Sequence, residues 1–308
     1  ATGELVRVVD DSKEVIATLT PGLDNFAFDA SDTAYVSSYA DGFIKRINED
    51  GSVRTLQPEG IAHPGGLAVI GDTVWVADVH ALRGFDRRTG EEIVTQRNVV
   101  GVGQLGGSIN ASADGDRIIL TSWFDGDARV WDPNVQERVE QYPNLAGPVA
   151  AVRYGGGLAI AEHIKGSVSL FGEGEPVKLA TELSAPTGLY VFDDALYAGD
   201  RELGQIMMLA RGGIALDEPE VVADDLEAPE GFLITETGIV VVEAEAARIV
   251  HIDKDQTRRV LAEIPAGSAS APGLPPSQIF NGIAIDEDGH LFISGETSRV
   301  LYRIEAPW

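Results

Sequence analysis

One pattern recurs seven times along this chain of 308 residues: a turn, an apolar strand containing a glycine, a second apolar strand ending in a polar residue, and a third strand. Its clearest copies read PTGLYV at 186–191, PEGFLI at 229–234 and FNGIAI at 280–285. The seven copies start at positions 24, 65, 106, 148, 187, 230 and 281, so neighbouring copies start 39 to 51 residues apart. Repeats of roughly 40–45 residues with several short strands each are typical of propeller blades.

The repeat therefore predicts an all-β chain that forms a single β-propeller domain over residues 1–308. We expect seven four-stranded blades, with a six-bladed ring as the alternative. The last copy supplies three strands only, at 283–285, 291–294 and 300–304. The segment 14–19 precedes the first copy and resembles a fourth strand. Pairing it with the last copy would close the ring through an N-terminal outer strand and remove a free sheet edge.

Composition limits the partners that this chain can have. The net charge is -26, which repels nucleic acid and anionic lipid. No apolar run approaches the ~18 residues of a membrane span, and cysteine is absent. We expect a small-molecule partner, with neither nucleic acid nor membrane. The first residue is Ala1 rather than Met, which favours a secreted or periplasmic protein over a cytoplasmic one.

The first strand of each copy begins at the mouth of the central channel, where ligands of such folds bind. At this strand-start position three copies that are consecutive around the ring carry Glu230, Asn281 and Asp24. Carboxylate and amide oxygens converging on one mouth suit a hard divalent cation, calcium before magnesium. Each of these residues can instead cap its own turn. We favour a shared metal site.

The second strands end at the same face, and four of them end in an acid: Asp78, Glu162, Asp200 and Glu243. An acid repeated in this way indicates a structural role, accepting backbone N–H groups of its loop. Glu243 and Glu296 share blades with Glu230 and Asn281, which makes them candidates to line the pocket. His163, next to Glu162, is the best-placed histidine for general acid–base catalysis. It can equally be an ordinary loop residue.

The units TGLYV at 187–191 with ALYAGD at 195–200, and NGIAI at 281–285 with HLFIS at 290–294, resemble the SMP-30/gluconolactonase-like propellers and the related NHL-type repeats. This resemblance implies a divalent ion, typically calcium, held at the channel by Glu, Asn and Asp. It also implies hydrolysis of lactones or organophosphates. Asn281 stands in an Asn-Gly unit similar to that family's metal-binding asparagine. A count of seven units is closer to the virginiamycin B lyase-like propellers, which use a histidine and a metal to open a cyclic ester by elimination.

We therefore expect a divalent-cation-dependent hydrolase that opens a lactone or a similar small ester. Its metal would bind Glu230, Asn281 and Asp24, and Glu243, Glu296 or His163 would act as the base. Glu230 is a candidate for both roles. The alternatives are a virginiamycin B lyase-like C–O lyase, with His163 or His80 as the base, and a non-catalytic propeller that binds a small molecule or a protein. The oligomeric state stays open.

Overall fold

The computed structural model describes residues 3–9, 12–29, 31, 33–48, 50–98, 104–264, 281–295 and 298–305. Within these ranges the regular elements are β-strands. The same ranges contain no helix with the length and apolar character needed to span a bilayer. The strands form seven antiparallel sheets, one for each copy of the repeat, and a separate two-stranded hairpin. The predicted all-β propeller with repeated four-stranded sheets is confirmed.

The N-terminal part comprises a hairpin and one sheet. The hairpin pairs β1 (Glu4–Val9) with β2 (Ser12–Thr18). The sheet that follows, called the lateral sheet below, contains β3 (Leu23–Phe28), β4 (Ala34–Ser38), β5 (Ile44–Ile47) and β6 (Val53–Gln57).

Six further sheets follow in chain order. They are β7 (Leu67–Ile70), β8 (Thr73–Asp78), β9 (Ala81–Asp86) and β10 (Glu92–Arg97); β11 (Asn110–Asp114), β12 (Arg117–Ser122), β13 (Asp127–Asp132) and β14 (Glu137–Tyr142); β15 (Pro148–Tyr154), β16 (Gly157–Glu162), β17 (Ser167–Phe171) and β18 (Val177–Ala180). The last three are β19 (Pro186–Phe192), β20 (Ala195–Asp200), β21 (Gln205–Arg211) and β22 (Ile214–Ala223); β23 (Pro229–Thr235), β24 (Gly238–Glu243), β25 (Arg248–Asp253) and β26 (Arg258–Glu263); and β27 (Ile283–Ile285), β28 (Leu291–Gly295) and β29 (Val300–Ile304).

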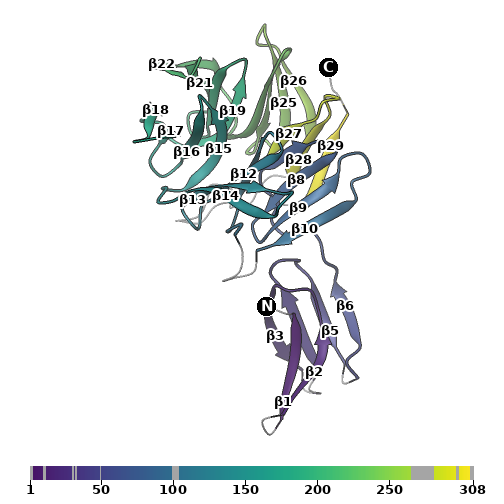
Figure 1. The fold of residues 1–308 in the computed structure, drawn as a ribbon. Coiled ribbons are helices and arrows are strands. Elements are labelled where there is room, and N and C mark those ends of the chain that lie inside the picture. Colours follow the sequence, from purple (N-terminus) through teal and green to yellow (C-terminus); the bar gives the residue numbers. More distant parts are fainter. Residues whose placement is uncertain are drawn as a thin grey trace.

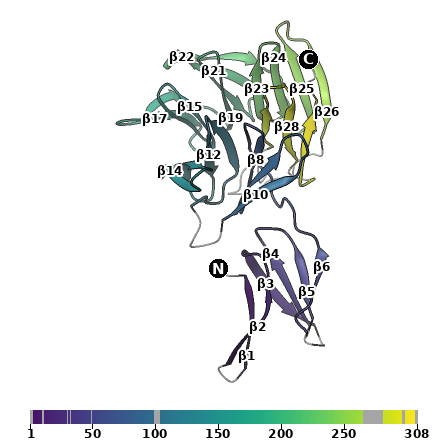
Figure 2. The same cartoon turned by 45° about the vertical axis from the view of Figure 1, so that its right-hand side comes forward.

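These six sheets form a closed ring (Figure 1). Their first strands β7, β11, β15, β19, β23 and β27 lie next to one another in that order, and β27 packs against β7. The lateral sheet and the hairpin lie outside the ring, below it in both views (Figures 1 and 2). The six-sheet ring therefore closes between the second and the last copies of the repeat. We call this junction the seam.

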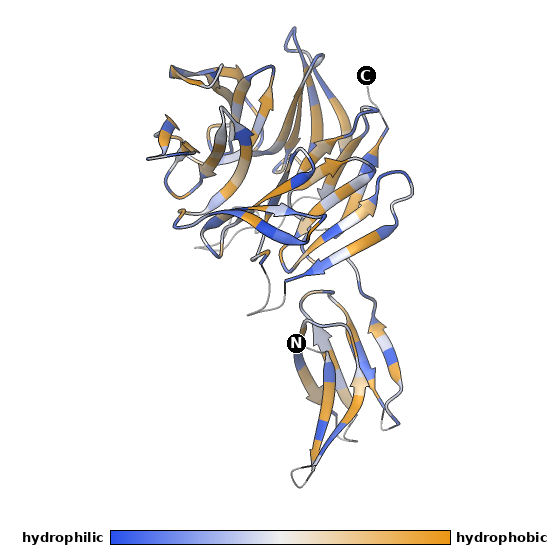
Figure 3. Ribbon diagram, in the orientation of Figure 1, coloured by the Kyte–Doolittle hydropathy of each residue, from blue (hydrophilic) through white to orange (hydrophobic). Residues whose placement is uncertain are grey.

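Packing explains the apolar pattern of the repeat. The second strand of a sheet lies between two neighbouring sheets, so both of its faces are buried and it reads as a continuous apolar run. All six residues of β16 are buried, whereas the outer strand β14 is mostly exposed. Hydrophobic segments accordingly gather in the strands of the ring (Figure 3).

Two details of the fold prediction differ: the first sheet lies outside the ring, and the predicted closing strand pairs elsewhere. The segment 14–19 falls largely in β2, which pairs with β1, and the last sheet has three strands within the described ranges. Leu5 and Ile16 of the hairpin pack instead against the buried side chains of Ala34, Val36 and Ile47 in the lateral sheet. The hairpin therefore covers the lateral sheet, its neighbour in sequence, and β29 is an edge strand among the described residues.

Side-chain ion pairs close the seam. Arg87, in the β9–β10 turn, donates through Nη1 to Asp286 (2.9 Å) and Asp288 (2.7 Å), and through Nη2 to Glu287 (2.9 Å). Its Nε donates to Asp72 in the β7–β8 turn at 3.2 Å. The partners Asp286 to Asp288 lie about two hundred residues further along the chain. One guanidinium thus joins the first and last sheets of the ring.

The charges of this cluster support one another. Burial alone would raise the pKa of Asp286, but hydrogen bonds from the backbone and ring of His290 and from Arg87 outweigh burial and lower that pKa. Hydrogen bonds to Asp288, Asp286 and Asp72 raise the pKa of Arg87 in turn. Both groups therefore stay charged near neutral pH.

We expect Arg87→Ala to lower the thermal unfolding midpoint. The Asp286 side chain is 2% exposed, and it would keep its charge while losing its cation. The matched control is Arg88→Ala, which removes an exposed arginine from the same turn. Calorimetry or circular dichroism melts of both variants provide the measurement. Equal midpoints for Arg87→Ala and Arg88→Ala would contradict this account of ring closure.

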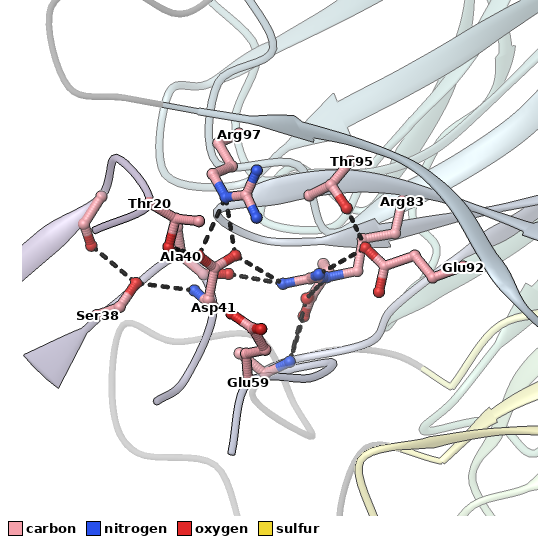
Figure 4. Close-up of polar contacts among 12 residues, drawn as sticks. Thr20, Ser38, Ala40, Asp41, Glu59, Arg83, Glu92, Thr95 and Arg97 are labelled. Carbon is pink, nitrogen blue, oxygen red and sulfur yellow. Dashed lines mark hydrogen bonds and ion pairs between the residues drawn. The ribbon is translucent and has the colours of Figure 1, made fainter. Parts of the chain in front are cut away.

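A second group of ion pairs holds the lateral sheet to the ring (Figure 4). Asp41, which is buried in the turn after β4, accepts from Arg97 Nε at 2.9 and 3.1 Å and from Thr20 Oγ1 at 2.7 Å. Arg83 Nη2 lies 3.6 Å from the Asp41 carboxylate and donates to the Ala40 carbonyl oxygen at 2.8 Å. Two arginines of the β9–β10 hairpin therefore hold one turn of the lateral sheet.

Two histidines lie beside this contact. The His63 and His80 rings are 6.3 Å apart, and the Tyr39 ring meets His80 edge-on at 5.0 Å. Burial lowers the pKa of both histidines, although the charge of Asp78 opposes this effect at each of them. The unfolded chain therefore takes up these two protons at a higher pH than the folded protein.

The pKa shifts predict a pH-dependent stability. The contribution of neutral His63 and His80 is fully present above the unfolded pKa of about 6.5. It is lost as the pH falls through their lower folded pKa values. We expect the denaturant midpoint to fall as the pH drops below about 6.5, and His63→Gln with His80→Gln to flatten this slope. Parallel curves for the wild type and the double variant would show that other groups cause the decline.

Candidate functional site

A cavity of about 280 Å³ runs between the first strands of the six ring sheets. Most of its lining is apolar, as expected of a small-molecule site. Six of the lining side chains are polar and can fix the orientation of a ligand: Asn110, Ser112, Arg153, Thr187, Glu230 and Asn281. Thr187, Glu230 and Asn281 occupy the strand-start positions of three neighbouring sheets, so they lie together at the mouth.

Glu230 is the centre of the polar group at the mouth. Its side chain is fully buried near the start of β23. Its Oε2 accepts from the backbone N–H of Asn281 at 2.8 Å and from Asn281 Nδ2 at 2.9 Å. The Arg201 Nε lies 3.5 Å from Glu230 Oε1 and forms an ion pair with it. The structure thus brings Glu230 and Asn281 together, as their positions in the repeat indicate.

Arg201 stands between the acids Asp200 and Glu202 in the sequence, but its ion pair is with Glu230 of the next sheet. It follows the strand-end acid of β20, as His163 follows that of β16. This position faces the mouth, because the loop between second and third strands returns to the same face as the first-strand start. The position of Arg201 in the repeat is the sequence feature that indicates the mouth, and there Arg201 lies beside Glu230.

His163 lies one sheet away from Arg201 and is half-buried. Its Nδ1 is 2.8 Å from the carbonyl oxygen of Pro186, directly before Thr187. A carbonyl oxygen only accepts hydrogen bonds, so Nδ1 carries the proton and Nε2 is the basic nitrogen of the neutral ring. The Trp123 ring packs on His163 at a centroid distance of 5.5 Å.

The four strand-end acids share one structural role. Each side chain is buried and accepts a hydrogen bond from the backbone N–H of the residue sixteen positions earlier, namely Ala62 to Asp78, Ala146 to Glu162, Ser184 to Asp200 and Glu227 to Glu243. This confirms the structural interpretation of the repeated acid. Glu243 also accepts from Arg248 Nε at 2.5 Å and is not among the cavity-lining residues of the described part.

Asp200 shows how much these acids support the mouth. Its fully buried carboxylate accepts from the backbone N–H groups of Ser184, Ala185, Glu202 and Leu203. We expect Asp200→Ala to lower the free energy of unfolding by roughly 3 kcal/mol, because buried donors lose their acceptor. The exposed neighbour Glu202 provides the control variant Glu202→Ala, expected within about 0.5 kcal/mol of wild type. Urea unfolding measures both, and a small loss for Asp200→Ala would contradict the role.

The remaining predicted residues lie elsewhere. Asp24 is exposed on β3 of the lateral sheet, where it accepts from Asn25 Nδ2 at 2.9 Å. Its charge acts on His80, partly offsetting the pKa lowering that burial causes there. Asp24 is not a lining residue of the cavity within the described ranges. Glu296 lies outside the described residues.

Among the described residues, nitrogen groups of Asn281 and Arg201 lie against the Glu230 carboxylate. Calcium takes six to eight oxygen ligands, whereas the Glu230 carboxylate faces N–H groups of Asn281 and the guanidinium of Arg201. Arg201 thus places a positive charge beside Glu230. A group of three acid or histidine side chains with close ligand atoms occurs at Asp286, Asp288 and His290, where Arg87 already binds both aspartates.

Comparison with known proteins shows the fold. No family model matches the chain, and no curated protein matches it. Among solved structures, a Bacteroides thetaiotaomicron protein of unknown function has a TM-score of 0.60 at 13% identity, covering 96% of this chain and 88% of its own. Virginiamycin B lyase from Staphylococcus aureus has a TM-score of 0.55 at 13% identity, covering 89% and 92%.

A third similar structure comes from a nidogen/laminin complex, with a TM-score of 0.55, 16% identity and coverage of 71% of this chain and 89% of the other. At these identities the likeness concerns the fold alone. The repeated sheets, the ring of first strands and these neighbours together establish a β-propeller.

Proposed function

We propose that this protein is an enzyme that opens a lactone or similar small ester at the mouth of its channel. The observation that carries the proposal is the buried Glu230 carboxylate, which accepts from Asn281 and pairs with Arg201. Arg201 and His163 in turn contact the consecutive residues Ala185 and Pro186. A cation and an imidazole at one mouth supply the two functions that ester opening needs. One stabilises negative charge that develops on the carbonyl oxygen, and the other removes a proton.

Arg201 supplies the positive charge. Glu230 and the backbone contact between the Arg201 N–H and the Ala185 carbonyl oxygen (2.9 Å) fix its position. A guanidinium held in this way needs little reorganisation when the carbonyl oxygen of a bound ester becomes negative. In this scheme Glu230 and Asn281 act as positioning residues. They orient the cation and line the floor on which the ester rests.

His163 is the base of the proposed reaction. The Pro186 carbonyl oxygen fixes the proton on Nδ1, so Nε2 can accept one from water or from carbon. In hydrolysis, His163 would activate the water that attacks the carbonyl carbon. The proton then returns to the leaving alkoxide oxygen when the C–O bond breaks.

Elimination is the second candidate. The same His163 would remove a proton from the carbon next to an activating carbonyl, and the ester oxygen would leave as a carboxylate from the neighbouring carbon. Arg201 would then stabilise the enolate or the departing carboxylate. The fold neighbour virginiamycin B lyase bears the name of such an activity and covers most of this chain, which favours testing this route.

Calcium at Glu230, Asn281 and Asp24 stays a prediction. Where it binds, calcium would polarise the carbonyl group of the ester. The binding test is calorimetric titration of the purified protein with Ca²⁺, for the wild type and for Glu230→Gln. Calcium affinity that Glu230→Gln abolishes would support this prediction.

The proposed function is tested with a panel of lactones and cyclic esters. We expect His163→Ala to lower kcat/KM by about 10²–10⁴-fold, and Arg201→Lys to lower it by about 10²-fold or more. His251 lies on β25 beside Thr237 of the β23–β24 turn (3.3 Å from its Nε2 to Thr237 Oγ1), at the end of the sheet opposite the mouth, and provides the control variant His251→Gln. Oxygen from ¹⁸O-water in the product indicates hydrolysis, and an unsaturated product without it indicates elimination.

Binding without turnover would contradict an enzymatic role. If the wild type binds a panel compound without turnover, and His163→Ala leaves that binding unchanged, the mouth is a binding site without catalysis. The non-catalytic propeller would then be the better account.

A further inference from the structure

The lateral sheet has the pattern of a ring sheet but lies outside the ring. Phe26 pairs with Val36 across β3 and β4, as Leu67 pairs with Val76 across β7 and β8. Yet Phe26 is 64% exposed, whereas its counterparts in ring sheets are buried: Leu67 at 4%, Leu189 at 8%, Phe232 at 4% and Ile283 at 8%. The large apolar side chain of Phe26 therefore faces solvent where its counterparts form core.

The exposed face has a defined counterpart in the ring. Leu67, Val74, Val76 and Phe85 form one face of the β7–β10 sheet, which packs against Ala284 and Phe292 of the last sheet. The equivalent positions of the lateral sheet carry Phe26, Ala34, Val36 and Ile47. The equivalence follows from the strand pairing, because Ala34 pairs with Ile47 as Val74 pairs with Phe85. Two sheets thus present equivalent apolar faces suited to the same surface of the last sheet.

The cover that the lateral sheet now has is incomplete. The hairpin packs on Ala34, Val36 and Ile47. Phe26 and Phe28 remain 64% and 60% exposed, touching each other edge-on at 5.7 Å. The uncovered part is the inner end of the face, which in the other sheets lies nearest the channel. The hairpin therefore replaces a neighbouring sheet only in part.

The connection between the lateral sheet and the ring permits a change of position. Residues 58–66 join β6 to β7 without regular structure. At the mouth the seam is a contact of two glycines, where a Cβ on Gly282 would come within 2.6 Å of Gly66 Cα. At the opposite face the seam depends on Arg87 and its carboxylate partners. No strand is shared across it among the described residues, so opening it breaks no sheet.

We propose that the lateral sheet exchanges between its present place and a place inside the ring, between the β27–β29 and β7–β10 sheets. In the second state its Phe26 face covers Ala284 and Phe292, and the ring contains seven sheets. Asp24 then takes the place beside Asn281 that Gly65 and Gly66 occupy now, and the channel becomes wider. This inference does not rest on the proposed function.

The absence of cysteine allows a direct test with introduced pairs. Phe26→Cys with Ala284→Cys should form an intramolecular disulfide under mild oxidation only in the seven-sheet state. Leu67→Cys with Ala284→Cys is the matched pair for the six-sheet ring, because these residues belong to one buried cluster. We expect both pairs to cross-link within the monomer, as read by non-reducing electrophoresis and peptide mass spectrometry.

Two further measurements make the test decisive. Adding Arg87→Ala to the Phe26→Cys and Ala284→Cys variant should raise the yield of its disulfide relative to adding Arg88→Ala, because Arg87 binds the carboxylates across the seam and Arg88 is exposed. Spin labels at Ser52→Cys and Asp116→Cys, both exposed positions, should give two distance populations in double electron–electron resonance. This second pair leaves the core unchanged, so it serves even if a core variant fails to fold.

Three results would overturn the proposal. The first is a cross-link for the Leu67 and Ala284 pair alone, and the second is a single spin-label distance. The third is a disulfide of the Phe26 and Ala284 pair that joins two chains, because the face would then be covered by a second copy of the protein.

Discussion

Closure of the ring rests on the guanidinium of Arg87. The sheets of a propeller each pack on two neighbours, so the first and the last have to be held together by something other than chain connectivity. Here no strand crosses the seam within the described residues, and Arg87 joins the β7–β8 and β9–β10 turns to the Asp286–Asp288 turn instead. The six inner strands, and with them the cavity, keep their arrangement because this contact and the apolar contact beneath it hold.

Arginines that bind several carboxylates occur elsewhere in the molecule as well. With 49 acidic and 23 basic residues, carboxylates outnumber cations about twofold, and several arginines serve more than one of them. Arg83 pairs with Asp78, Asp41 and Glu92, and Arg153 pairs with Asp114 and Glu140. Planar guanidinium groups suit this use, because they present several donors in fixed directions. Part of the acidic excess is thus structural, because several carboxylates accept hydrogen bonds from one arginine.

Much of the fold could be predicted from the sequence, because the repeat is local. Turn residues and alternating apolar positions located the strands, and the repeated strand-end acid indicated the hydrogen bond that Asp200 and its equivalents make. Glu230 and Asn281 could be paired because neighbouring repeats place equivalent positions side by side. The partner of Arg87 could not be predicted, since it lies about two hundred residues away and no periodic pattern marks it. The same holds for Asp24, whose position depends on where a whole sheet lies rather than on any feature of its strand.

The glycine contact at the seam has a mechanical consequence. Gly66 and Gly282 meet backbone to backbone at one side of the ring, and ion pairs complete the junction at the other. Elsewhere around the ring, adjacent sheets are joined by the covalent chain as well as by their packed faces. A pulling force on the ring would therefore separate the molecule first at this one junction. The sheets would separate from one another with their strands still paired. The strands within a sheet would separate only at a higher force.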